Sequence, residues 1–137
     1  MILTLHLSIV IALGLLVLYS DEQAYLWVLG KKPILNGARI MILHRTISVG
    51  LAALLITGGL LYIQAVPAYL SNSTFIIKMT VIAALILNTY LIEKFSHVAT
   101  TQTFASLKTS ERIPLFISGV VSALGWITAI TCGWILS

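Results

Sequence analysis

The sequence predicts an all-α integral membrane protein, a four-helix bundle whose successive helices run up, down, up and down. Hydrophobic residues make up 59% of the 137 residues and charged residues only 9%, and the mean hydropathy is +1.06, far above that of soluble domains. Four apolar stretches are each long enough to cross about 30 Å of hydrocarbon as a helix: residues 2–19, 40–63, 75–92 and 113–136. Little sequence lies outside them, so we predict a single transmembrane domain over residues 1–137.

The basic side chains predict how these helices are oriented. Seven of the eight Lys and Arg residues flank the two connections on one side of the predicted bundle: Lys31, Lys32, Arg39, Arg45, Lys94, Lys108 and Arg112. By the positive-inside rule these connections are cytoplasmic and both termini lie outside, which predicts a multi-pass protein of the cell inner membrane. Because the cations mark loops and do not form one binding face, the net charge of +4 does not predict a nucleic-acid partner.

The first stretch, residues 2–19, has the features of a retained helix and not of a cleaved signal peptide. No basic residue precedes it and no small-residue cleavage pattern follows it. In the connection after it, Tyr25 and Trp27 predict an aromatic anchor at the membrane interface, and Gly30 with Pro33 predicts a tight turn.

Polar and small residues predict the ends and the packing of the later helices. Residues 71–74 are polar and predict a cap for the third helix. Residues 96–111 predict a loop, with Pro114 in the first turn of the fourth helix, where its missing N–H costs little. Small residues recur at spacings of three and four on one face of that helix and predict close packing: Ser118, Ser122, Gly125, Ala129 and Gly133.

His6 and Lys78 are the principal candidate site residues. Each lies about one turn inside the outer end of its predicted helix, so both side chains lie at a similar depth. We interpret His6 as a ligand of a metal or of haem iron through its neutral imidazole. Lys78 would then pair with a haem propionate or a quinone oxygen, or act as a second ligand. The alternative is that Lys78 snorkels to the headgroups and His6 is an interfacial polar residue.

His44 lies near the opposite, cytoplasmic end of the predicted bundle. By the rise per residue it is about 20 Å or more from His6, so one metal cannot bind both. We interpret His44 as a candidate cofactor-binding residue at a second haem or metal position, or as a step in a proton relay. The alternative is a hydrogen bond between His44 and the carboxylates of Asp21 and Glu22 at the end of the first helix.

For the remaining polar residues we predict structural roles. His97 follows Glu93 by four residues, and an exposed pair at a helix end accounts for both. Asn88 predicts an interhelical hydrogen bond, and the single cysteine, Cys132, excludes an intramolecular disulfide. No catalytic residue is predicted, because the chain has no His pair at i, i+4 spacing, no Cys-x-x-Cys motif and no nucleophile with a base.

The polar positions also resemble those of known families. The matching segments are Leu5-His6 opening the first helix, Thr57-Gly58 late in the second, and Phe75 to Met79 opening the third, followed by Asn88. In these segments the chain resembles small helical membrane proteins of the copper-resistance D family. The histidine on helix one and lysine on helix three also resemble the J-type protoporphyrinogen oxidase family, whose members bind haem b in a membrane. This resemblance implies His6 as haem ligand and Lys78 as its polar companion.

The first functional hypothesis is therefore a haem-b-binding membrane redox protein. It would pass electrons or hydrogen equivalents within the bilayer to a quinone or a membrane redox partner. The second is a transporter of copper or another small solute, in which Lys78 and His44 mark the two ends of a polar path. The third is a non-catalytic membrane subunit whose small-residue face on the fourth helix packs on other chains or on a second copy.

Overall fold

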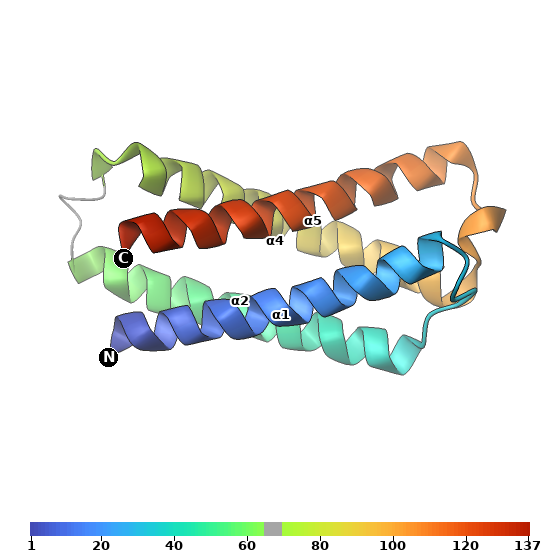
Figure 1. The fold of residues 1–137 in the computed structure, drawn as a ribbon, viewed down its shortest axis with the longest axis horizontal. Coiled ribbons are helices and arrows are strands. Elements are labelled where there is room, and N and C mark those ends of the chain that lie inside the picture. Colours follow the sequence, from blue (N-terminus) through green and yellow to red (C-terminus); the bar gives the residue numbers. More distant parts are fainter. Residues whose placement is uncertain (65–69) are drawn as a thin grey trace.

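The computed structural model describes residues 1–64 and 70–137 (Figure 1). The chain is all-helical, with four long helices and one short 3₁₀ helix: α1 (Ile2–Val28), α2 (Gly37–Gln64), α4 (Ser73–Thr101), η1 (Phe104–Ser106) and α5 (Thr109–Leu136). Each of the four long helices in this part of the chain is long and apolar enough to cross a membrane, which confirms the predicted helical class. All four run lengthwise, and both termini lie at the same end of the bundle (Figure 1).

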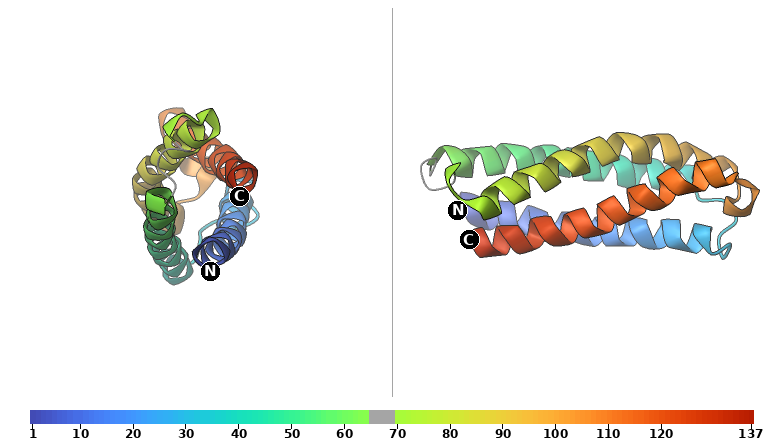
Figure 2. Two further views of the ribbon diagram at one scale, coloured as in Figure 1. Left: turned by 90° about the vertical axis from the view of Figure 1, so that its left-hand side faces the viewer. Right: turned by 90° about the horizontal axis from the view of Figure 1, so that it is seen from above.

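The four helices pack in a ring, so each has two main neighbours. α1 packs against α2 and α5, and α4 packs against the same two helices. The end-on view in Figure 2 shows α1 and α4 on opposite corners. A residue of α1 can therefore meet one of α4 only across the bundle interior.

Small residues allow these close approaches. A Cβ added to Gly125 of α5 would lie 2.7 Å from the Leu85 side chain of α4, and one added to Gly50 of α2 would overlap with Leu13 of α1. The predicted small-residue face of α5 thus packs inside the bundle, with Ser118 and Ser122 both 4% exposed. This face contacts α4 and α1 within the bundle.

At the end away from the termini, the helices are longer than the apolar stretches that predicted them. α1 continues to Val28 and α4 to Thr101, where a loop was expected from residue 96. The reason is tertiary packing at this end, where a cluster of buried side chains joins the helix ends and the loops: Trp27, Leu35, Ala99 and Leu107.

Trp27 shows the effect of this packing. The predicted interface anchor is wrong for this residue: its side chain is 2% exposed, and its indole N–H donates a 3.0 Å hydrogen bond to the Gln102 carbonyl. Its ring packs edge-to-face on Phe104 of η1, with centroids 5.3 Å apart. Tyr25, by contrast, is 62% exposed.

The start of α4 agrees with the prediction from the sequence, and the start of α5 does not. The Asn72 side chain accepts a 2.9 Å hydrogen bond from the Thr74 N–H, which confirms the predicted cap of α4. α5 begins earlier than predicted, because the Glu111 carboxylate accepts a 2.8 Å bond from the Lys108 N–H at its start. Pro114 consequently lies inside α5 and not in its first turn.

Candidate functional site

His6 and Thr57 join α1 to α2 near the end that carries the termini. His6 is 7% exposed and Thr57 is 8% exposed, so both residues are buried inside the bundle. The distance from His6 Nδ1 to Thr57 Oγ1 is 2.8 Å, an ordinary hydrogen bond. His6 is therefore an interior residue held by a specific partner and not a loose interfacial side chain.

The contacts of Thr57 are compatible with one particular tautomer of His6. The Thr57 hydroxyl lies 2.9 Å from the Ala53 carbonyl and 3.3 Å from the Leu54 carbonyl of its own helix. A carbonyl can only accept, so when Thr57 donates there it accepts from His6, and Nδ1 is the protonated nitrogen. Nε2 of the neutral ring then carries a free lone pair. This is the tautomer in which an imidazole binds iron or another metal through Nε2, with its other N–H tied to a protein oxygen.

The glycine after Thr57 lies beside the imidazole. A Cβ added to Gly58 would lie 3.4 Å from His6 Cε1, a close van der Waals contact. Thr57 and Gly58 thus both lie next to the ring, and the threonine bonds to it.

Lys78 approaches the same region from α4. It is partly buried, and its ammonium group lies against α5, where a Cβ added to Gly133 would lie 3.5 Å from Nζ. α1 and α4 are diagonal in the bundle, and among the described residues no hydrogen bond or ion pair joins Lys78 to His6. The two side chains therefore share one end of the bundle without a direct contact.

Cys132 and Thr57 are parts of this cluster that the sequence reasoning did not assign. Cys132 is 7% exposed and precedes Gly133, the residue of α5 against which the Lys78 ammonium lies. The available signal was position: Cys132 precedes Gly133 near the C-terminal end of α5, as Thr57 precedes Gly58 late in α2. We define the outer cluster as His6, Thr57, Lys78 and Cys132.

The donor set limits which cofactors the outer cluster can hold. Within residues 1–64 and 70–137, no three His, Cys, Asp or Glu side chains are grouped as a metal site would require. A haem needs only one or two axial ligands from the protein, because its porphyrin supplies the other four. A single histidine such as His6 is therefore enough to serve as a protein ligand of a haem, whereas a bare metal ion would need more donors.

Comparison with known proteins gives no information on the chemistry of the outer cluster. No protein-family model, curated protein or solved structure matches this chain.

A second group of polar side chains surrounds an interior cavity in the half of the bundle away from the termini. The cavity has a volume of about 60 Å³, and its polar lining includes Asp21, His44, Asn88 and Ser122. Both carboxylate oxygens of Asp21 lie 3.4 Å from the Ser122 hydroxyl, which donates to them across the α1 and α5 interface. We call this cavity, with the residues that line it, the inner cavity.

The structure gives His44 a different partner from the one expected. His44 Nε2 lies 3.9 Å from a carboxylate oxygen of Glu93 on α4. Asp21 lines the same cavity as His44, but the described residues show no bond between His44 and either Asp21 or Glu22. Glu93 faces His44 because α2 packs on α4, so the expected pair of Glu93 with the exposed His97 is not formed.

Asn88, which lines the inner cavity, forms a reciprocal pair of hydrogen bonds with Ser118 of α5. The Asn88 amide donates to the Ser118 carbonyl at 3.0 Å, and the Ser118 hydroxyl donates to the Asn88 side-chain oxygen at 2.8 Å. Asn88 is only 3% exposed. The predicted interhelical role of Asn88 is thus confirmed.

Proposed function

We propose that this protein binds haem b within the membrane and transfers electrons or hydrogen equivalents, with His6 as the residue that would hold the iron. The observation that carries the proposal is the hydrogen bond from His6 Nδ1 to Thr57, which leaves the Nε2 lone pair available. When bound, haem b supplies a one-electron iron couple in the hydrocarbon layer.

Each residue of the outer cluster has a role in this proposal. Thr57 holds the imidazole in the ligating tautomer and limits its rotation. The Lys78 ammonium supplies a positive charge in a region of low dielectric constant, where it would pair with a propionate or with the oxygen of a quinone. Cys132 is buried, and we give it no step in the transfer.

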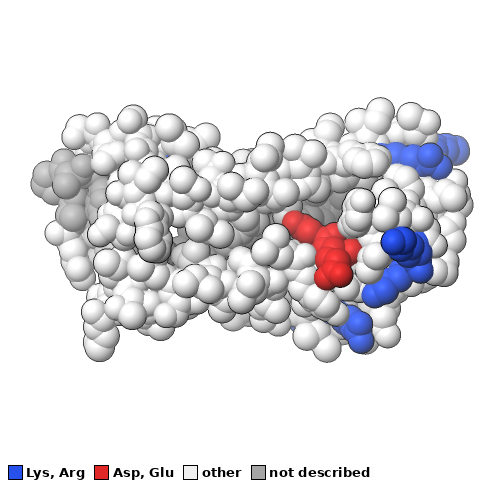
Figure 3. Space-filling model, in the orientation of Figure 1, with Lys and Arg blue, Asp and Glu red and all other residues white. Residues whose placement is uncertain are grey.

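We further propose that the helices cross the cell inner membrane up, down, up and down, with both termini outside. The support is the charge distribution: Lys and Arg side chains gather toward the end opposite the two termini (Figure 3). Under the positive-inside rule that end is cytoplasmic. The outer cluster would then lie near the outer leaflet.

A visible spectrum of the protein purified in mild detergent tests the haem proposal. We expect a b-type reduced-minus-oxidised spectrum and a stoichiometric pyridine haemochrome, either as purified or after incubation with haemin. His6→Ala should lose the pigment, whereas His97→Ala, a change at an exposed histidine, should keep it. A wild-type protein that stays colourless after incubation, or equal haem in both variants, would overturn the proposal.

The inner cavity favours transport as a second candidate function. A carboxylate inside membrane-spanning helices is costly and usually marks an ion or proton path. Asp21 and His44 both line this cavity, with Glu93 beside His44. Protein in vesicles should then pass protons or copper ions down an imposed gradient, and Asp21→Asn should abolish the flux. Flux equal to that of empty vesicles would exclude transport of these ions.

A further inference from the structure

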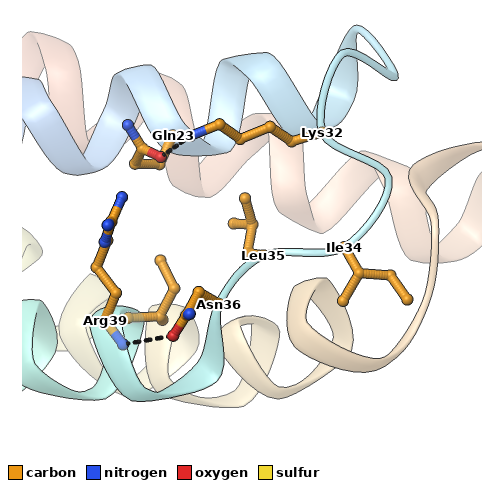
Figure 4. Close-up of a pocket in the computed structure, with 7 residues that line it drawn as sticks. Gln23, Lys32, Ile34, Leu35, Asn36 and Arg39 are labelled. Carbon is orange, nitrogen blue, oxygen red and sulfur yellow. Dashed lines mark hydrogen bonds between the residues drawn. The ribbon is translucent and has the colours of Figure 1, made fainter.

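A second cavity lies at the basic end of the bundle, where α1 meets the start of α2. Its volume is about 220 Å³, and its lining combines four polar and several apolar side chains (Figure 4). The residues that matter here are Gln23, Lys32, Leu35, Asn36, Arg39 and Ile40. None of them belongs to the outer cluster or the inner cavity.

The turn after α1 places Lys32 over this cavity. Gly30 has φ +72°, a backbone conformation that side chains disfavour, and its N–H donates to the Trp27 carbonyl. The chain thereby reverses, and the Lys32 N–H donates to the Leu26 carbonyl at 3.1 Å. The Lys32 ammonium then donates to the side-chain oxygen of Gln23.

The start of α2 places Arg39 on the facing wall. The Asn36 side chain accepts a 3.1 Å hydrogen bond from the Arg39 N–H and so begins the helix. Figure 4 shows the Arg39 side chain extending from α2 toward Gln23. A cation from each wall therefore reaches the same cavity.

These donors are not neutralised by the protein. Over residues 1–64 and 70–137, neither Lys32 nor Arg39 forms an ion pair with a carboxylate. The Arg39 guanidinium has one neutral partner, the Tyr19 hydroxyl at 3.4 Å, and the Lys32 ammonium has another in Gln23. Two cations with only neutral partners around one cavity are complementary to an anion with several oxygens.

We propose that this cavity, the Lys32–Arg39 pocket, binds the phosphate of an anionic phospholipid headgroup. A lipid is favoured because the pocket lies at the end of membrane-spanning helices, at the level where headgroups occur. The apolar side chains of Leu35 and Ile40 line the same pocket, and they suit the glycerol and first acyl carbons of a lipid. The proposal does not depend on haem or transport.

Lipid titration of the detergent-purified protein, followed by native mass spectrometry, tests the pocket. The probes are phosphatidylglycerol, the zwitterionic phosphatidylcholine and inorganic phosphate. Removing both cations with Lys32→Gln and Arg39→Gln should weaken phosphatidylglycerol binding by about 30-fold. The matched control, Lys31→Gln with Lys94→Gln, removes the same charge from the same end outside the pocket and should change affinity less than threefold by the same reasoning.

Other outcomes would overturn the proposal. Equal loss in the paired variant and its control would mean that only the net charge of this end matters. Inorganic phosphate that displaces phosphatidylglycerol at equal concentration would make the pocket a site for free anions. The charge-retaining change Lys32→Arg should keep the affinity, so loss of binding there would also count against the proposed site.

Discussion

The hydroxyl of Thr57 on α2 fixes the ring of His6 on α1 through a hydrogen bond of 2.8 Å. When Thr57 donates its own proton to the Ala53 carbonyl, the bond to His6 also selects the tautomer of the imidazole. One residue thus contributes to the packing of two helices and to the chemistry of a candidate ligand.

Replacing Thr57 with Val should therefore affect stability and cofactor binding together. The near-isosteric change removes the acceptor of the His6 N–H and should lower the free energy of unfolding by about 0.5–2 kcal/mol. Haem affinity should fall as well, because the ring is no longer oriented. Thermal unfolding in detergent and haem titration measure the two effects.

The control for Thr57 is Thr80→Val. Thr80 is exposed on α4, and its hydroxyl bonds only to the Ile76 carbonyl of its own helix. We expect it to match the wild type in both measurements. A Thr57→Val protein that behaves like this control would show that the bond to His6 contributes nothing.

Lys78→Met should change stability and haem binding in opposite directions. Methionine keeps much of the lysine stem but removes a charge from the bundle interior, so the protein should unfold at a higher temperature. Haem affinity should fall, because the partner of the propionate is lost. Lys94→Met, at an exposed position, should leave both quantities unchanged. A lower unfolding temperature for Lys78→Met would indicate that the ammonium is well paired within the bundle.

Glycines at two helix contacts should not tolerate a methyl group. Gly125→Ala must displace Leu85, and Gly50→Ala must displace Leu13, so each should lower the free energy of unfolding by about 1–3 kcal/mol. At Gly119 and Gly59 an added Cβ meets nothing within 4 Å, so alanine there should be neutral or stabilising by up to about 1 kcal/mol. Chemical unfolding of the four variants should separate these pairs; equal effects would refute the close packing of α5 on α4 and of α2 on α1.

The Asn88 and Ser118 pair should be energetically coupled. Ser118→Ala leaves the buried Asn88 oxygen without its donor and should cost about 1–3 kcal/mol. In a protein that already carries Asn88→Ala, Ser118→Ala should lower the free energy of unfolding by less than it does in the wild type. The difference is the coupling energy, about 0.5–3 kcal/mol. A double-mutant cycle measured by unfolding checks this, and simple additivity would contradict the reciprocal bonds.

The candidate site could be predicted in part. The depth of His6 and Lys78 follows from counting residues along a helix, so their position near the same end of the bundle was accessible from the sequence. The hydrogen-bond partner of His6 could not be predicted. Identifying Thr57 requires knowing how α2 is rotated about its axis, and the sequence does not give this rotation. His44 shows the same limit: its partner is Glu93 on α4 and not Asp21 or Glu22.

The sequence by itself determined the class of the protein: four helices long and apolar enough to span a membrane, and cations such as Lys32 and Arg39 placed at one end. Helix formation in apolar surroundings depends on local composition, because backbone groups must bond within each helix. Tertiary structure decided the rest, including the burial of Trp27 and the Lys32–Arg39 pocket. The physical reason is that these helices are apolar on all sides, so no amphipathic stripe marks the inward face and packing alone selects it.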